Sequence, residues 1–255
     1  MKCIILTSNG LRHSYFINAI KTSFEIVGCI REPKKNYYNK IRDESTVVRD
    51  HFKRLSDAEN RIFGKNEINN IDILNVDKKS INDKQYIEWV KSKDAECIFL
   101  FGTGILGLDW LNLFPHKIIN LHLGISPYYR GSGTMFWPFY ENKYGLVGTT
   151  THIAARDVDA GSIISRHQAN YKEGESYYQV VNKTIKDSID MFPLVCISYL
   201  NNRINPSKQI LNEGKTYYKK DFTEQKILDI KDKLLNGLSN YEISNIRLLN
   251  EDFDS

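Results

Sequence analysis

Short apolar runs alternate with amphipathic stretches along the first part of the chain. The run at residues 2–7 predicts a buried strand, and the helical pattern after it places Phe16, Ile20 and Phe24 on one face. A second apolar run spans residues 26–30. A strand, a helix and a strand in this order are typical of a βαβ unit, so the sequence predicts an α/β fold with a mostly parallel, twisted sheet.

The same alternation continues to about residue 204. We expect helices at 44–63, 81–91, 134–142 and 177–200, strands at 71–76, 97–101, 117–121, 148–154 and 162–166, and a loop at 123–133. Pro193 is expected to kink the longest helix. A hairpin at 210–218 and a helix at 223–235 follow. The pattern predicts a sheet domain at 1–204 and a small C-terminal hairpin and helix appendage at 205–255.

Composition and charge exclude several classes of protein. The 255 residues include 35 Lys and Arg against 31 Asp and Glu, a net charge of +4, and 41% are hydrophobic, as in globular chains. No stretch reaches ~18 apolar residues, so no membrane span is expected, and the N-terminus lacks a signal-peptide pattern. The basic residues between 31 and 42 are interrupted by Glu32, which favours a solvated loop over a nucleic-acid contact.

The cysteines indicate a reducing compartment. Cys3, Cys29, Cys97 and Cys196 do not form a CxxC pair, and the first three lie inside apolar runs. Buried free thiols are the natural interpretation of such a pattern. We therefore expect a cytoplasmic protein with no metal site.

Three polar side chains stand near the ends of predicted strands: Asn120, His122 and Asp159. Ligands of open α/β sheets bind outside the carboxyl ends of the strands. Asn120 and His122 are two residues apart, so on a strand both point to one face. Each residue also has a structural interpretation: Asn120 as a loop cap, His122 as a core histidine, and Asp159 as a turn residue. Spacing alone leaves both interpretations open.

Four motifs in order carry a resemblance to a known family. The chain reads Asn-Leu-His at 120–122, Pro-Tyr-Tyr-Arg-Gly at 127–131, Thr-Thr-His at 150–152 and Asp-Ala-Gly at 159–161. In these motifs it resembles the formyltransferases that use 10-formyltetrahydrofolate, which include glycinamide ribonucleotide transformylase, methionyl-tRNA formyltransferase and the sugar-nucleotide N-formyltransferases. The resemblance, clearest over residues 97–168, implies a Rossmann-like formyltransferase fold whose catalytic domain is the region 1–204.

The resemblance also implies roles for the three polar residues. Asn120 would hold the formyl oxygen, and a protonated His122 would stabilise the negative charge that develops when an amine attacks the formyl carbon. Asp159 would favour the protonated form of His122 and accept or relay the proton that the amine loses. His152 matches the family's second histidine and is placed as support near Asp159. Neither a metal nor a covalent intermediate is needed.

A folate pocket is the second implication of the resemblance. Its cofactor-binding residues would be Thr103, Gly104, Ile105 and Leu106, which match the segment against the pterin, and Ala155, Arg156, Asp157 and Val158, which match the loop at its polar edge. The alternative for residues 102–107 is a strand-to-helix connection that needs glycines for its turn. A dinucleotide fingerprint is disfavoured there, because no acidic residue follows at the required spacing.

Two features indicate which amine is formylated: residues at which the chain departs from the family pattern, and the length of the chain. Gly-Ile-Ser-Pro stands at 124–127, where members acting on nucleotides and tRNA usually have Ser-Leu-Leu-Pro, and only about 50 residues follow residue 204. A compact core with a short extension looks most like the sugar-nucleotide N-formyltransferases, which would imply a folate and a nucleotide-sugar substrate and a role in surface-glycan (lipopolysaccharide O-antigen) synthesis. Phe136 and Trp137 either line the acceptor pocket or anchor the next helix.

Several alternatives stay open at this point. The acceptor could be Met-tRNA or glycinamide ribonucleotide, water could replace the amine in a 10-formyltetrahydrofolate hydrolase, and an inactive nucleotide-binding module would be a non-enzymatic alternative. The turn at residues 8–10 either binds a phosphate or is a plain turn. His13, His51, His116 and His167 are expected to be surface or structural residues. The sequence leaves open the sugar, a homodimer formed through the C-terminal appendage, and closure of the loop at 37–45.

Overall fold

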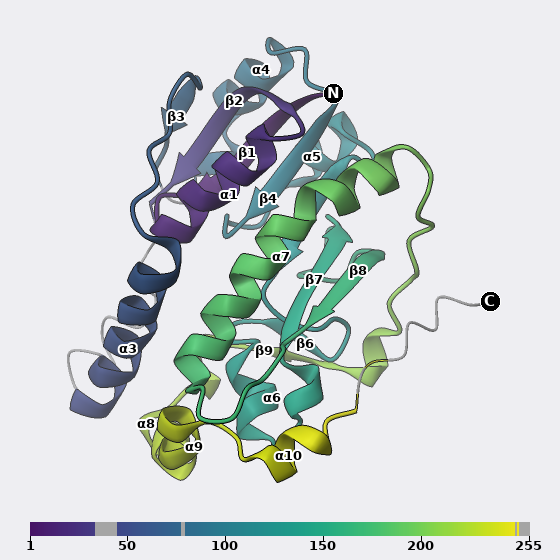
Figure 1. The fold of residues 1–255 in the computed structure, drawn as a ribbon. Helices are drawn as coiled ribbons and strands as arrows, with labels where there is room; N and C mark the ends of the chain where they lie inside the picture. The colour runs from purple at the N-terminus through teal and green to yellow at the C-terminus, as the bar shows by residue number, and fades with distance from the viewer. Residues whose placement is uncertain (34–44, 78–79, 248, 250–255) are drawn as a thin grey trace.

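A seven-stranded sheet forms the centre of the computed structural model, which describes residues 1–33, 45–77, 80–247 and 249 (Figure 1). The order of the strands is β3-β2-β1-β4-β5-β7-β8. The first five of these are parallel, whereas β7 is antiparallel to both β5 and β8. The strands are β1 (Lys2–Ser8), β2 (Glu25–Glu32), β3 (Ile73–Asn75), β4 (Cys97–Phe101), β5 (Ile118–His122), β7 (Gly148–Ile153) and β8 (Ile163–Gln168). The predicted α/β fold with a mostly parallel sheet is confirmed.

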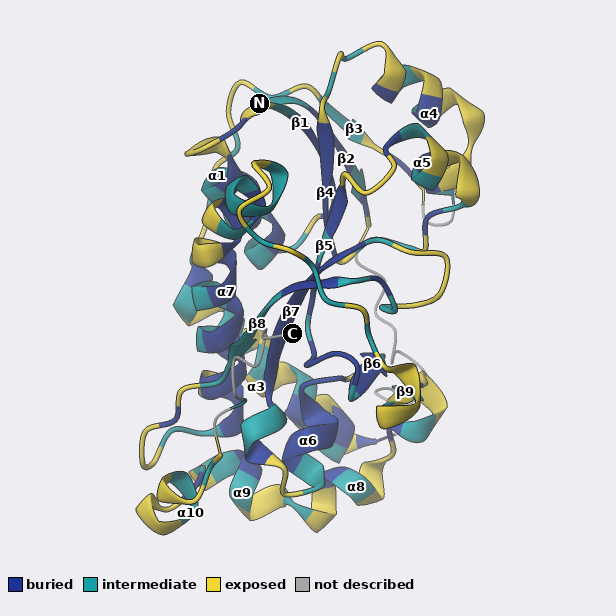
Figure 2. Cartoon of the chain, turned by 90° about the vertical axis from the view of Figure 1, so that its right-hand side faces the viewer, coloured by how far each residue is buried: buried dark blue, intermediate teal, exposed yellow. Residues whose placement is uncertain are grey.

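Helices cover both faces of the sheet and give a three-layered molecule (Figures 1 and 2). On one face lie α1 (Leu11–Lys21), α3 (Thr46–Phe63) and α7 (Tyr177–Leu200). On the other face lie α4 (Lys84–Lys91), which follows the 3-10 turn at Ser80–Asn82, and α5 (Leu108–Leu113). Ser176 caps α7 in a capping box with Gln179, and the helix continues through Pro193 to Leu200.

The central strands are apolar on both faces because each face has its own core. Along β1, Cys3 and Ile5 belong to the core under α1 and α7, whereas Ile4 and Leu6 belong to the core under α4 and α5. All four side chains are fully buried. A strand buried on two sides reads as a continuous apolar run, which is why the sequence located β1 and β4 so closely.

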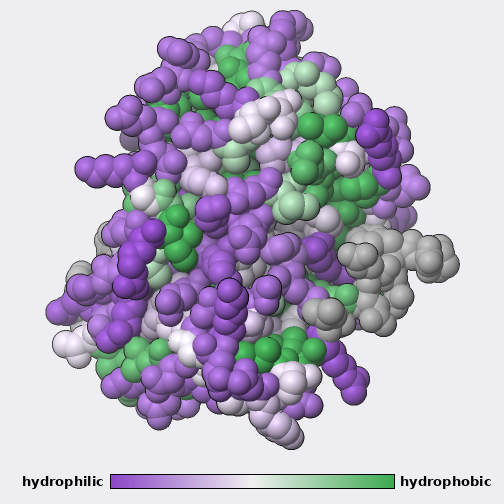
Figure 3. All heavy atoms as spheres, in the orientation of Figure 1, coloured by the Kyte–Doolittle hydropathy of each residue, from purple (hydrophilic) through white to green (hydrophobic). Residues whose placement is uncertain are grey.

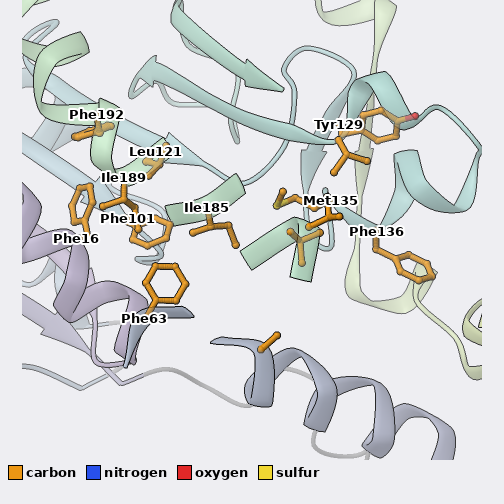
Figure 4. Close-up of a cluster of buried hydrophobic side chains, with 14 of the residues drawn as sticks. Phe16, Phe63, Phe101, Leu121, Tyr129, Met135, Phe136, Ile185, Ile189 and Phe192 are labelled. Atoms are coloured by element: carbon orange, nitrogen blue, oxygen red, sulfur yellow. The ribbon is translucent and has the colours of Figure 1, made fainter. Parts of the chain in front are cut away.

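The larger core runs from Phe16 at one end to Phe136 at the other (Figure 4). Phe16, Phe101 and Phe192 form one end of it, with the ring centre of Phe16 lying 5.2 Å from that of Phe101 and 5.1 Å from that of Phe192. Ile185 connects this group to Phe136 and its neighbours at the other end. All four cysteines are buried free thiols, as predicted.

The C-terminal region differs from its prediction. Residues 210–218 do not form a hairpin: a 3-10 turn at Leu211–Glu213 leads into β9 (Lys215–Tyr217), which pairs in parallel with β6 (Tyr129–Gly131). Strand β6 lies inside the segment expected to be a loop. The helix expected at 223–235 is divided into α8 (Glu224–Asp229) and α9 (Lys231–Asn236), which are followed by α10 (Asn240–Ser244).

These C-terminal elements pack against the main body. Phe222, Ile227, Leu234 and Leu238 are buried in the same core as α7 and the short helix α6 (Phe136–Tyr140). The face of the molecule in Figure 3 is mostly hydrophilic, with hydrophobic residues in small separate groups. Within the described residues, no helix combines the length and apolar character needed to cross a membrane. The loop at 37–45 lies, apart from Ser45, outside the described residues.

Candidate active site

One cavity of about 600 Å³ brings together the three polar residues singled out in the sequence. Asn120 and His122 lie on the last residues of β5 and both line the cavity, as their two-residue spacing predicts. Asp159 reaches the same cavity from the turn between β7 and β8, where its backbone adopts a φ of 51°. Strand β7 runs antiparallel to β5, so it ends beside the start of β5, away from His122. The turn after β7 returns toward the end of β5, where Asp159 accepts a hydrogen bond from Gly131 of β6. The topology therefore joins residues that are far apart along the chain.

His122 and Asp159 form a buried pair. His122 Nδ1 lies 3.3 Å from Asp159 Oδ2, and the two side chains are only 6% and 15% exposed. His122 Nε2 lies 2.9 Å from the carbonyl oxygen of Tyr129. The backbone N–H of Gly131 donates to Asp159 Oδ2 at 3.0 Å. Both nitrogens of the imidazole thus face an oxygen: Nε2 in a hydrogen bond with the Tyr129 carbonyl, and Nδ1 in a contact with the Asp159 carboxylate that becomes an ion pair when the ring is protonated.

Burial and neighbouring charges have opposite effects on the pKa of each member of this pair. Burial lowers the pKa of His122, and the Asp159 carboxylate opposes that change. Burial alone would raise the pKa of Asp159, but the neighbouring His122 and His152 and the Gly131 N–H outweigh it and hold this pKa well below its usual range. Asp159 is therefore ionised, and its charge favours the protonated form of His122 against the effect of burial.

Asn120 is oriented by His152. The two residues are directly opposite each other on β5 and β7, and Asn120 Nδ2 lies 3.0 Å from His152 Nε2. His152 Nδ1 lies 2.9 Å from the carbonyl oxygen of Ile153, so in the neutral ring Nδ1 carries the proton and Nε2 accepts from the amide. The amide NH₂ keeps a second hydrogen for a ligand. His152 Nε2 also lies 3.7 Å from Asp159 Oδ1, near the place that the resemblance gave it.

The first segment expected to bind folate lines the cavity, and it is called here the first arm or folate arm. Thr103, Gly104, Ile105 and Leu106 all contribute to its wall, and Ile105 is 64% exposed. Side chains from elsewhere hold this segment by its backbone. Glu32, at the end of β2, accepts the N–H of Gly104 at 2.6 Å. Asn82 donates to the carbonyl of Ile105 at 3.0 Å and accepts the N–H of Gly107 at 2.7 Å.

The second segment contributes three of its four residues. Ala155, Asp157 and Val158 line the cavity, whereas Arg156 is not among the lining residues. The two segments together contribute small and apolar residues to the wall of the cavity. This arrangement suits a flat, partly polar ring that is held by main-chain groups.

A second group of lining residues, called here the second arm of the cavity, was missed by the sequence analysis except for Phe136. It comes from α3, α6, α7 and the segment before α8 and consists of His51, Phe52, Leu55, Phe136, Tyr177 and Phe222. His51, expected to be surface or structural, is buried and its Nδ1 lies 3.2 Å from the hydroxyl of Tyr178. His13 is also buried and lines the cavity. The apolar face of the helix 44–63 was a usable signal, because His51 lies one turn after Val48 on it.

Two roles were left open for Phe136 and Trp137, and the structure gives one role to each residue. Phe136 lines the second arm of the cavity. Trp137 is equally buried but is not among the lining residues: its ring stacks on Tyr217 at 4.7 Å between ring centres, and its Nε1 donates to the carbonyl of Ser132 at 2.8 Å. Trp137 therefore anchors β9 against α6, and Phe136 is the one available to a ligand.

Burial of His51 predicts a pH-dependent stability. Burial lowers the pKa of His51 to about 4 from an ordinary value of 6.5, so the folded chain takes up this proton less readily than the unfolded chain. The stabilising contribution is complete above pH 6.5 and is lost as the pH falls toward 4, by up to about 3 kcal/mol at 1.36 kcal/mol per unit. In denaturant titrations between pH 7 and 4, His51→Gln should lose less stability than the unmodified chain. An equal loss of stability with falling pH in the variant and the unmodified chain would contradict the effect assigned to His51.

Comparison with known proteins places this geometry in context. A family model described as formyl transferase matches residues 1–196. Among curated relatives, the bifunctional polymyxin resistance protein ArnA of Wigglesworthia glossinidia brevipalpis is 25% identical over 152 residues, 59% of this chain and 23% of that protein. The formyltetrahydrofolate deformylase of Bacillus subtilis is 26% identical over 118 residues, 45% of this chain and 39% of that protein. The matches thus span well under half of these relatives.

Solved structures share the fold. The phosphoribosylglycinamide formyltransferase from Anaplasma phagocytophilum has a TM-score of 0.57 at 19% identity, covering 80% of this chain and 89% of that one. The formyltransferase PseJ from Anoxybacillus kamchatkensis, solved with UDP-4,6-dideoxy-4-formamido-L-AltNAc and tetrahydrofolate, has a TM-score of 0.52 at 17% identity, covering 93% and 100%. In the part of this chain that the structure describes, no group of three or more His, Cys, Asp or Glu side chains could hold a metal ion.

Proposed function

The chain belongs to the formyl transferase family, and from this premise we propose that it transfers the formyl group of 10-formyltetrahydrofolate to the amine of a nucleotide-linked amino sugar. The convergence of Asn120, His122 and Asp159 in one cavity is the observation that carries the proposal. The folate supplies the activated formyl group. The chain supplies a hydrogen-bond donor, a buried imidazole and a carboxylate around the place where that group would react.

Each of the three residues has a role that its geometry supports. The second hydrogen of the Asn120 amide is free to bind the formyl oxygen, because the first is directed at His152. A protonated His122, favoured by the Asp159 carboxylate, would stabilise the negative charge that grows on that oxygen as the amine adds, an effect that is strong in a buried site. Asp159 favours the protonated form of His122 and accepts the proton that the amine loses, directly or through a water molecule. That proton then passes to the folate nitrogen as its bond to the formyl carbon breaks, so the tetrahydrofolate leaves as a neutral amine.

The folate would bind against the first arm of the cavity. A volume of about 600 Å³ is within the range of cavities that hold molecules of this size. Thr103 to Leu106 would contact one face of the pterin, and Ala155, Asp157 and Val158 its edge. Backbone groups fixed by Glu32 and Asn82 would give that ring a rigid set of hydrogen-bond partners.

The second arm supports an acceptor with a flat, uncharged part. Its walls are aromatic, and His51, its most buried polar residue, has a pKa lowered to about 4 and stays neutral at neutral pH. A nucleobase carried by a sugar substrate matches these walls, and PseJ, of the same fold, was solved with a UDP-linked formamido sugar. The carbon that carries the amine would then lie near Asn120 and His122, at the junction of the two arms.

An acceptor screen tests the proposal. The chain is incubated with 10-formyltetrahydrofolate and, separately, with UDP-, dTDP- and GDP-linked amino sugars, glycinamide ribonucleotide and Met-tRNA, and products are read by the mass gain of a formyl group. A formylated sugar nucleotide is the expected result. Formylation of Met-tRNA or glycinamide ribonucleotide alone would overturn the acceptor class, while the family and the assigned residues would stand.

Hydrolysis of the folate is the second candidate. A formyltetrahydrofolate deformylase is among the relatives of this chain, and the same three side chains could serve an attacking water. Formate release that is fast without any amine, and that no acceptor accelerates, would favour this candidate over transfer.

The hydrogen bonds by which Asn82 holds the first arm give a separate prediction. Asn82→Ala removes both hydrogen bonds that fix Ile105 and Gly107, each worth about 0.5–1.5 kcal/mol. The KM for 10-formyltetrahydrofolate should rise about 5–30-fold, with a smaller change in kcat, because binding energy is lost and the reacting groups stay in place. Asn112→Ala, at an exposed position on α5, is the matched control. An unchanged KM for the folate would disprove the folate arm.

A further inference from the structure

We infer that the C-terminal segment Ser207–Tyr217 positions the His122–Asp159 pair, with Gln209 as the positioning residue for Asp159 and Tyr217 as that for His122. The inference rests on the proposed function, in which this pair is catalytic. It goes beyond it, because the segment lies outside residues 1–196 that match the family and outside the sheet domain expected from the sequence. None of its residues touches a reacting atom.

Gln209 holds the turn that carries Asp159. Its side-chain NH₂ donates to the carbonyls of Asp159 at 2.8 Å and Gly161 at 2.6 Å. Both partners are carbonyl oxygens, which accept only, so the amide nitrogen must face them. Asp159 needs such support, because its φ of 51° is uncommon for a residue that has a side chain. Two residues earlier, Ser207 and Ile163 exchange a pair of backbone hydrogen bonds of 2.9 and 2.8 Å, which brings the segment to the start of β8.

The other end of the segment holds β6, which contacts both members of the pair. Tyr129 offers its carbonyl to His122 Nε2, and two residues later Gly131 donates its N–H to Asp159 Oδ2. Strand β9 pairs with β6 along its whole length, with Lys215 opposite Tyr129 and Tyr217 opposite Gly131. A displacement of β6 would therefore change the hydrogen bonds of the histidine and of the carboxylate together.

Side chains fix the register of the two strands. The hydroxyls of Tyr129 and Tyr217 donate to the two oxygens of one carboxylate, that of Glu141, at 2.9 and 2.6 Å. The two tyrosine rings are stacked at 5.7 Å between ring centres. The backbones also approach very closely, because a Cβ at Gly131 would lie 2.3 Å from the carbonyl oxygen of Tyr217. The pairing leaves little room for β6 to shift while β9 is in place.

Positioning and binding predict different kinetic results. The residues of the segment that hold the pair contribute no wall to the folate arm, so their loss should reduce kcat and leave the KM for the folate unchanged. An error of about 1 Å in the place of a catalytic group can cost roughly 100-fold in rate. The loss should also alter the proton affinity of His122, since the Asp159 carboxylate raises the pKa of that ring.

The test compares Gln209→Ala and Tyr217→Phe with Gln225→Ala, a control at an exposed glutamine on α8. We expect Gln209→Ala to lower kcat about 10–100-fold with the KM for 10-formyltetrahydrofolate within about 2-fold. The His122 ring, followed by ¹⁵N NMR and assigned from a His122→Asn spectrum, should lose its proton at a lower pH. Tyr217→Phe keeps the ring stack and removes only the hydroxyl, so a smaller kcat loss in the same direction is expected.

Three outcomes would overturn the inference: unchanged kcat in both variants, an unchanged titration of His122, or equal losses in the Gln225→Ala control. A variant that lost kcat only through unfolding would lower the melting temperature without changing the ring titration of the folded fraction, and this too counts against positioning. The NMR titration needs no acceptor. A failed acceptor screen would therefore leave this test intact.

Discussion

Replacing His122 with alanine is expected to lower kcat by about 10²–10⁴, the loss typical of a missing acid–base or charge-stabilising partner. The imidazole lies between the carbonyl of Tyr129 and the carboxylate of Asp159 and lines the cavity. The KM for the folate should change little, because the ring is not part of the folate arm. Initial rates at saturating folate measure the effect.

An exposed histidine provides the control for this variant. His116 lies on the surface, away from the cavity, in a left-handed backbone conformation with a φ of 60° that asparagine accepts well. His116→Asn should keep full activity. A His122→Ala enzyme that also kept its rate would remove the imidazole from the mechanism, whatever the acceptor is.

Replacing Asp159 with asparagine should have a loss of the same order, about 10²–10⁴ in kcat at neutral pH, together with a displaced pH profile. Burial lowers the pKa of His122, and the carboxylate counteracts it. Without the carboxylate, His122 should lose its proton at a lower pH, so the alkaline limb of the kcat/KM profile should move toward acid. Rates measured from pH 5 to 9 give the displacement directly.

The stability of this variant offers an independent check. The pKa of Asp159 is lowered in the folded chain, so the ionised carboxylate contributes stability above its ordinary value of 3.8, and this contribution is lost as the pH falls below that value. The unmodified chain should therefore exceed Asp159→Asn in stability at pH 7, with the difference shrinking toward pH 3. A difference that is constant with pH would mean that the carboxylate is not charged in the fold.

The sequence could predict the sheet because its signals are local. Strands β1 and β4 are buried on both faces and appear as unbroken apolar runs, and the helix Tyr177–Leu200 has both a cap and a long periodic face. The motifs around Asn120, His122 and Asp159 were equally local. Their convergence in one cavity agrees with the prediction, although their catalytic roles stay proposals.

What the sequence could not predict depends on contacts between distant segments. Strand β6 has three residues in a stretch rich in glycine, serine and proline, and it is a strand only because β9, more than 80 positions later, pairs with it. The expected hairpin was wrong for the same reason, since β9 takes its partner from that distant segment. His51 was assigned to the structure or the surface because nothing local indicates that α8 and α6 close a cavity over it.

The interior thiols have a consequence for the chemistry of the intact protein. Burial raises the pKa of Cys29 and of Cys97 to about 12, and that of Cys3 and Cys196 further still. Oxidants and alkylating reagents attack the thiolate, which such groups hardly populate near neutrality. Covalent modification of these sulfurs therefore requires the sheet to open, so the rate of their modification reports the rate or extent of unfolding.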